Sequence, residues 1–170
     1  MTATVVSESR SGFLTRLVIP LAIAAAIAAC PVPEGLTEPD PDTGDRWSPG
    51  QVWGHMAELV PYWLGVVSMI LTEGSVDPVP FGRDGSDPLR MAGIERGMHE
   101  PPTRLMAEIQ EGIAELSKLM KRIDRSGWSA RGRHPAMGVM DVERIIEQFE
   151  VGHLEAHERQ LDLLRQGAGE

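Results

Sequence analysis

The sequence feature that most constrains the fold is an apolar stripe at helical spacing in the second half of the chain. It follows Pro101 and Pro102 and consists of Leu105, Ile109, Ile113, Leu116, Met120 and Ile123. Spacings of three and four residues place all six side chains on one face of an α-helix. The stripe therefore predicts a helix over residues 103–124 that packs this face against the rest of the protein.

Further helices are predicted at residues 14–29, 48–71 and 141–165. The clearest start is that of the second, where Ser48 can cap the helix, Pro49 suits the first helical position and Gln51 completes a Ser-x-x-Gln capping box. Aromatic residues are few, and Leu, Ile, Ala, Val and Met dominate the apolar set, which favours helix packing over a β-sandwich. We expect one all-α domain spanning residues 1–170.

The segments between these helices have turn-rich compositions. Residues 31–46 carry four prolines and two glycines and are predicted to be a connector. Residues 73–100 are predicted to be a long loop over one end of the helices, apart from a short helix that Asp87 can cap with Pro88 at its first position. Residues 125–138 are predicted to be a loop that leads to the last helix.

Charge and motif content exclude several classes of function. Sixteen Lys and Arg against 25 Asp and Glu give a formal charge of −9, which argues against a DNA or RNA partner because the field would repel phosphate. The sequence has no Gly-rich phosphate loop, paired zinc-binding cysteines or hydrolase elbow, which argues against nucleotide, zinc-finger and serine-hydrolase functions.

The N-terminal apolar segment has two interpretations. Residues 13–30 end in IAAC and resemble a bacterial lipoprotein signal with Cys30 as the lipidated residue. The same segment has leucines and alanines at helical spacing and can be the first helix of the domain, in a protein that stays in the cytoplasm. If it is that helix, Leu17 and Leu21 should be largely buried.

Three histidines occupy inward positions on two predicted helices. In VGHLEAHERQL, His153 and His157 are four residues apart on the apolar stripe of the last helix, and His55 lies on the apolar face near the start of the second. Residues at i and i+4 stand about 6 Å apart, so both imidazoles can reach one metal ion, and a bundle can bring His55 opposite them. Three imidazoles would leave a fourth position open, as in catalytic zinc sites.

A structural explanation of these histidines stays open. Inward histidines are often hydrogen-bonded to helix carbonyls or carboxylates, and burying imidazole nitrogens without partners costs about 1 to 3 kcal/mol each. If the site exists, ring nitrogens of all three histidines should lie within about 3 to 4 Å of one another.

At this point the residues carry a family resemblance. WSPGQVWGHMAEL, followed a hundred residues later by VGHLEAHERQLDLL, resembles the DinB/YfiT-like superfamily over about residues 13–166. The resemblance implies an up-down-down-up antiparallel four-helix bundle with a long loop between helices 2 and 3. It also implies that His55, His153 and His157 bind a divalent metal, zinc or nickel, between which the sequence does not select.

What the resemblance implies about chemistry is a metal-dependent and thiol-dependent transferase or isomerase. Relatives include S-transferases that use mycothiol or bacillithiol and a mycothiol-dependent maleylpyruvate isomerase. In such a mechanism the metal would lower the pKa of a cofactor thiol and present a thiolate to an electrophile. The alternatives are a non-catalytic bundle with a structural or vestigial histidine cluster and a secreted lipoprotein carrying the same bundle.

Several other residues are candidates for supporting roles. Arg83 and Arg90 can bind carboxylates of a thiol cofactor or its small-molecule substrate, although both can equally be solvated loop residues. Glu58 and Glu150 can each orient an imidazole through a hydrogen bond. Trp53 or Trp63 can line the metal pocket. We expect no membrane partner unless Cys30 is lipidated, and a homodimer is compatible with the sequence.

Overall fold

The computed structural model describes Gly12, Arg16, Ala22 and residues 24–40, 44–73 and 77–167. Over these residues the chain is mostly helical, as predicted, but it also has one small three-stranded sheet, which the all-α prediction did not include. The helical elements are α2 (Pro49–Glu73), α3 (Pro88–Gly97), α4 (Pro102–Arg122), α5 (Arg125–Trp128), α6 (Val142–Ile145), the π-helical turn η1 (Ile146–Val151) and α7 (Gly152–Gly167). The strands are β1 (Val79–Pro80), β2 (Arg131–His134) and β3 (Gly138–Asp141).

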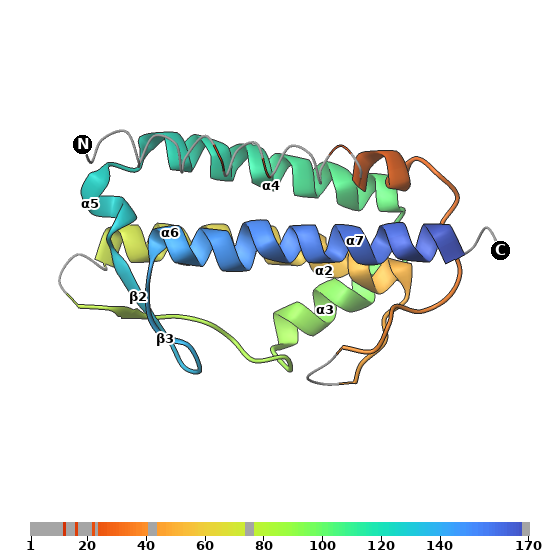
Figure 1. The fold of residues 1–170 in the computed structure, drawn as a ribbon, viewed down its shortest axis with the longest axis horizontal. Coiled ribbons are helices and arrows are strands. Elements are labelled where there is room, and N and C mark those ends of the chain that lie inside the picture. The colour runs from red at the N-terminus through yellow and green to blue at the C-terminus, as the bar shows by residue number, and fades with distance from the viewer. Residues whose placement is uncertain are drawn as a thin grey trace.

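Helix α2 is the centre of the fold. It contacts α3, α4, α6, η1 and α7. In Figure 1, α2 and α4 run in the same direction, and the rod formed by α6, η1 and α7 runs back against both. One 18-residue window of α2 is long and apolar enough to cross a membrane, but more than half of that window is buried inside the protein, as expected of a core helix, so this is weak evidence for a span.

The start of α2 has the predicted capping box. The Ser48 backbone N–H donates to Gln51 Oε1 at 2.9 Å, and the Gln51 N–H donates to Ser48 Oγ at 3.4 Å. These bonds satisfy two donors that a helix N-terminus would otherwise leave free. The helix therefore begins at Pro49, two turns before His55.

The apolar stripe of α4 is buried as predicted. Leu105, Ile109, Leu116 and Met120 are at most 1% exposed, and α4 ends at Arg122, two residues before the predicted boundary. Gly112 permits the close approach of α4 to α2, because a Cβ atom there would lie 2.5 Å from Val60 Cγ1.

Two pairs of glycines set the distance between α2 and α3. Gly50 and Gly54 on α2 face Gly93 and Gly97 on α3, and a Cβ atom on Gly54 would lie 2.7 Å from Gly97 Cα. No side chain fits between the two backbones at this crossing. The short helix predicted after Asp87 is confirmed as α3, and the Asp87 side chain accepts a hydrogen bond from the Arg90 N–H at 3.0 Å.

The C-terminal rod departs from a regular α-helix. The predicted helix over residues 141–165 contains the π turn η1, which has more residues per turn than an α-helix and rotates the face that follows. The predicted inward positions Phe149, Ala156 and Leu164 are only partly buried. The deeply buried positions of η1 and α7 are Ile146, Glu150, Val151, Leu154, His157, Glu158 and Leu161.

Residues 125–138 were predicted to be a loop, and this prediction is wrong in part. The segment contains α5 and β2, and β2 pairs antiparallel with β3 and parallel with β1 in a three-stranded sheet. The strands are two to four residues long, too short for an alternating apolar pattern to indicate them. Gly132 on β2 packs against Phe81 and Ile70, which fixes the sheet to the end of α2.

The described part of the N-terminal segment packs on the domain. Residues 24–28 are helical, and Ala24, Ile27 and Ala28 belong to the hydrophobic core. The Arg16 guanidinium binds the carboxylates of Glu155 on α7, at 2.7 Å, and Glu147 on η1. Leu17 and Leu21, whose burial would test the two interpretations of this segment, lie outside the described residues.

Candidate metal centre

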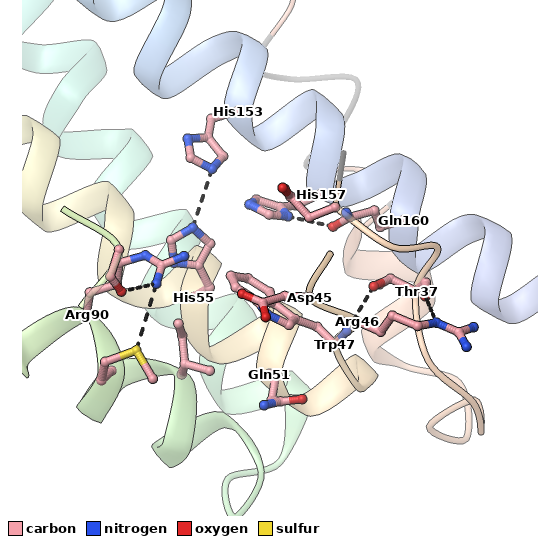
Figure 2. Close-up of a pocket in the computed structure, with 14 residues that line it drawn as sticks. Thr37, Asp45, Arg46, Trp47, Gln51, His55, Arg90, His153, His157 and Gln160 are labelled. Atoms are coloured by element: carbon pink, nitrogen blue, oxygen red, sulfur yellow. Dashed lines mark hydrogen bonds between the residues drawn. The ribbon is translucent and has the colours of Figure 1, made fainter. Parts of the chain in front are cut away.

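His55, His153 and His157 converge on one point at the end of the bundle where α2 begins (Figure 2). His55 Nε2 and His153 Nε2 are 3.4 Å apart, and one nitrogen from each of the three rings lies within 4.8 Å of the other two. The distance between His55 and His153 meets the predicted spacing of about 3 to 4 Å between ring nitrogens. The limit of 4.8 Å that holds for all three histidines is wider than this prediction. The ring centroid of His157 lies 4.9 Å from that of His55 and 4.7 Å from that of His153.

The orientation of the His55 ring depends on Glu58, one turn further along α2. His55 Nδ1 donates to Glu58 Oε1 at 3.0 Å, and this bond leaves Nε2 as the free lone pair that faces His153. Arg83 Nη2 donates to both Glu58 oxygens at 2.6 Å. Burial alone would raise the pKa of Glu58, but the hydrogen bonds from His55 and Arg83 hold that pKa below its usual value.

The His157 ring is oriented by Gln160 in the same way. Gln160 Oε1 can only accept a hydrogen bond, so His157 Nδ1, at 2.7 Å, carries the proton. The Nε2 atom of His157 is then unprotonated, and it is buried with no hydrogen-bond partner among the described residues. An imidazole lone pair that is buried without a partner and directed at two other imidazoles is the donor arrangement that a metal ion completes.

All three imidazoles are held in the neutral form that binds metals. Burial lowers the pKa of His55, and it lowers that of His157 well below its usual value. Burial, with the nearby charge of His55, lowers the pKa of His153 to about 4. The positive charge of Arg90 lowers all three further. The cluster is therefore unprotonated at neutral pH and needs no proton loss before a cation binds.

A cavity of about 670 Å³ opens in front of the histidines. Trp47 forms one wall, because its ring lies 11° from parallel to His157 at 5.9 Å between centroids and edge-on to His55 at 5.1 Å. Arg90 lies over the Trp47 ring at 5.3 Å and donates to the Gly85 carbonyl at 2.6 Å. Arg90 thus places a positive charge in the cavity beside the three rings (Figure 2).

The two arginines considered from the sequence have different surroundings. Arg90 lines the cavity, whereas Arg83 is absent from its lining and binds Glu58 while stacking over the Tyr62 ring at 3.8 Å. The other two histidines lie elsewhere: the His99 side chain is 71% exposed beside Glu95, and His134 stacks on Phe149.

Glu150, which was considered for orienting a histidine or for a solvated helix flank, has neither role in the structure. Both carboxyl oxygens of Glu150 are buried without a hydrogen-bond partner in the described part of the chain. The π turn explains this, because Glu150 lies within it and the added rotation directs the side chain into the core. Burial raises the pKa of Glu150 well above its usual value, so the carboxyl is neutral in the folded protein.

Sequence reasoning missed several residues of the cavity. Trp53 and Trp63 were considered for its wall, but both belong to the core, and Trp47 forms the wall instead. The available signal was the position of Trp47 directly before the Ser48 cap, two turns from His55 on the same end of α2. Thr37, Asp45 and Gln51 also line the cavity, and they come from or follow a connector whose path the sequence did not indicate.

Comparisons with known proteins support this description of the fold. The structure is similar to the crystal structure of the mycothiol-dependent maleylpyruvate isomerase, with a TM-score of 0.66 and 13% identity over 89% of this chain. This chain spans 60% of that protein's length. It is also similar to an uncharacterized protein from Clostridium difficile 630, with a TM-score of 0.64 and 11% identity over 92% of this chain and 95% of that one.

The family assignment comes from the sequence. No curated protein matches the chain. A family model described as the DinB superfamily matches residues 22–161, which include all three histidines of the cluster. The chain belongs to the DinB superfamily.

Proposed function

We propose that His55, His153 and His157 bind one divalent metal ion, and that the protein uses it in a thiol-dependent transfer or isomerisation reaction. The observation that carries the proposal is the buried Nε2 of His157, which has no hydrogen-bond partner in the described part of the chain and faces two rings whose Nε2 atoms are 3.4 Å apart. A purely structural cluster would satisfy that nitrogen with a donor.

The donor set suits zinc or nickel. Neutral imidazole binds both metals, and three protein nitrogens leave a position for a further ligand. When bound, such a metal supplies positive charge that lowers the pKa of a thiol in the cavity. Around it, Glu58 and Gln160 hold the imidazoles of His55 and His157 in the tautomers that present Nε2.

The thiol-dependent part of the proposal rests on two supports. One is the structural likeness to the mycothiol-dependent maleylpyruvate isomerase, whose name states its thiol cofactor. The other is Arg90, whose guanidinium lies in the cavity and can bind a carboxylate of a low-molecular-weight thiol or of its substrate. Trp47 forms one wall of the same space.

We extend the proposal to topology and location. The domain is proposed to be an up-down-down-up four-helix bundle, whose first helix comes from residues 14–29 and precedes α2, α4 and the α6–α7 rod. Burial of Ala24, Ile27 and Ala28 in the core and the ion pairs of Arg16 support a first helix that stays in the domain, and with it a cytoplasmic protein. A homodimer stays a prediction.

The test is metal analysis of the protein purified without a histidine tag. We expect about one zinc or nickel per chain, and replacement of His153 or His157 by alanine should abolish metal binding, whereas His99→Ala, at an exposed histidine, should leave it unchanged. His153→Leu should lose the metal and keep the stability of the metal-free bundle. Absence of metal from the wild-type protein after dialysis against zinc would refute the proposal, and unfolding of His153→Leu would indicate a structural histidine.

The thiol is tested on the cobalt-substituted protein. Direct coordination of a thiolate adds an intense charge-transfer band to the cobalt spectrum, so titration with mycothiol or cysteine should produce this band. Arg90→Gln should weaken the response to carboxylate-bearing thiols and leave a neutral alkyl thiol unaffected. A spectrum unchanged by every thiol would refute the thiol-dependent part and leave the metal site standing.

A further inference from the structure

A second cavity adjoins the one in front of the histidines. Its volume is about 500 Å³, and three of its lining residues, Thr37, Arg46 and Gln160, also line the histidine cavity. Those residues form the partition between the two spaces. The Arg46 Nε–H donates to the Thr37 carbonyl at 2.8 Å, and Arg46 is directed away from the histidines in Figure 2.

The lining of this outer cavity combines leucines with charged side chains. Leu36, Leu163 and Leu164 provide the apolar surface, and Leu36 and Leu163 are 49% and 61% exposed. Glu34, Glu38 and Arg46 also line the cavity. Exposed leucines gathered in a hollow favour an apolar ligand, and two carboxylates against one guanidinium give no net positive charge to attract an anionic one.

The geometry of α7 joins the two spaces along one path. His157, Gln160 and Leu164 are spaced at i, i+3 and i+7, so they follow one face of the helix over about 10 Å. Gly35 in the connector lies against this face, since a Cβ atom there would be 3.8 Å from Leu164 Cδ2. A ligand that starts at the histidines therefore meets the leucines about two helical turns further along.

We propose that the outer cavity is the subsite for the apolar part of the small molecule that the histidine cavity receives. The ligand class is an amphipathic molecule with a metal-binding or anionic head beside Arg90 and an uncharged apolar body that passes Gln160 and reaches Leu164, about 10 Å along α7 from His157. This inference rests on the proposed metal site, because the metal and Arg90 position the head. The outer cavity would make the site prefer substrates with an apolar part over small polar substrates.

The experiment uses zinc-loaded full-length protein and a series of alkylhydroxamic acids from two to eight carbons, with dissociation constants measured by calorimetry. The hydroxamate head binds the metal, and the alkyl tail probes the outer cavity. Once the tail passes Gln160, each added methylene should tighten binding about fourfold, the value for burial of one methylene group. Shorter tails should show little dependence on length.

Variants locate the effect. Leu163→Asn should weaken the eight-carbon ligand about tenfold or more and leave acetohydroxamate unchanged, because Leu163 lines only the outer cavity. Leu89→Asn is the matched control, since Leu89 is 77% exposed on α3 and lines neither cavity. Neither ligand should respond to it.

The outcomes separate the two proposals. Failure of the protein to bind zinc would overturn both. Zinc and acetohydroxamate binding with no gain from longer tails would overturn the subsite and leave the metal site intact. A gain that Leu163→Asn does not reduce would place the tail elsewhere and overturn the subsite, as would a ligand-free dimer, seen by sedimentation, that Leu163→Asn dissociates.

Discussion

Gly97→Ala should destabilise the protein although alanine is the better helix former. A Cβ atom at Gly97 would lie 2.5 Å from Gly54 Cα and closer still to the Gly50 carbonyl oxygen, whereas real Cβ contacts are essentially never under 3.0 Å. The difference, 3.0 minus 2.5, means that α3 must move from α2 by at least about 0.5 Å. Both partners are backbone, so neither can turn aside.

The expected magnitude follows from two opposing terms. Overpacking of this kind costs about 1 to 3 kcal/mol, and the helix propensity of alanine returns up to about 1 kcal/mol, less at the last residue of a helix. We therefore expect the free energy of unfolding to fall by about 1 to 2 kcal/mol. The melting temperature should fall by about 2 to 4 °C for each kcal/mol in a chain of this size.

The assay is urea unfolding followed by tryptophan fluorescence, with Gly65→Ala as the matched control. Gly65 lies inside α2, and a Cβ atom there meets nothing within 4 Å. The free energy of unfolding of Gly65→Ala should therefore rise by about 0.5 to 1 kcal/mol, because alanine has the higher helix propensity. Gly97→Ala should also weaken hydroxamate binding, because α3 carries Arg90. If Gly97→Ala is as stable as wild type or gains as much as Gly65→Ala, the close crossing does not hold α3 in place.

Three further predictions concern titratable groups. Glu58→Gln should weaken zinc binding about 10-fold to 100-fold, because it removes the hydrogen bond that orients the His55 ring. Glu95→Gln, which changes the partner of the exposed His99, should leave zinc binding unchanged. Equal zinc affinity of the two variants in a competition titration would contradict this prediction. Glu150→Met should raise the free energy of unfolding at pH 7 by about 1 to 3 kcal/mol, and the gain should shrink toward pH 4.5, where the unfolded carboxyl also becomes neutral. A gain that does not change with pH would mean that Glu150 is ionised in the fold. For the metal-free protein, the His153 pKa of about 4 against 6.5 when unfolded means that the unfolded chain binds the proton first as pH falls. His153 alone should thus lower the free energy of unfolding by about 3 kcal/mol between pH 6.5 and pH 4, from a pKa difference of 2.5 at 1.36 kcal/mol for each unit. In urea titrations, His153→Leu should remove this part of the pH dependence and leave the part due to His55 and His157, whose pKa values burial also lowers.

Features that depend on residues close together in the sequence could be predicted from the sequence alone. The Ser48 cap, the Asp87 cap and the stripe of α4 from Leu105 to Met120 depend on residues within one or two turns of each other. The convergence of His55 with the His153 and His157 pair followed from inward positions on two helices of one bundle. Each of these features uses only helical spacing and the rule that apolar faces pack together.

Features that depend on distant contacts were not predictable in this way. The β2–β3 hairpin lies against the domain at Gly132, where a Cβ atom would lie 2.5 Å from Phe81 and 2.6 Å from Ile70, and both residues are far away in the sequence. The inward direction of Glu150 depends on the π turn, which no local pattern indicates. Trp47 is held at the cavity by the connector, because the Thr37 N–H donates to the Trp47 carbonyl at 2.8 Å and the Trp47 N–H donates to Thr37 Oγ1 at 2.9 Å.

The π turn lets residues 146–151 hold one residue more than an α-helical segment of the same rotation. Deleting one residue here should therefore restore a regular α-helix and leave His153 and His157 facing His55 as they do now. The same deletion between His153 and His157 would turn one ring away from the other by about 100°. Relatives that keep the three histidines should therefore tolerate a one-residue gap within 146–151 far better than a gap within α7, where it would be a sign that the proposed metal site is lost.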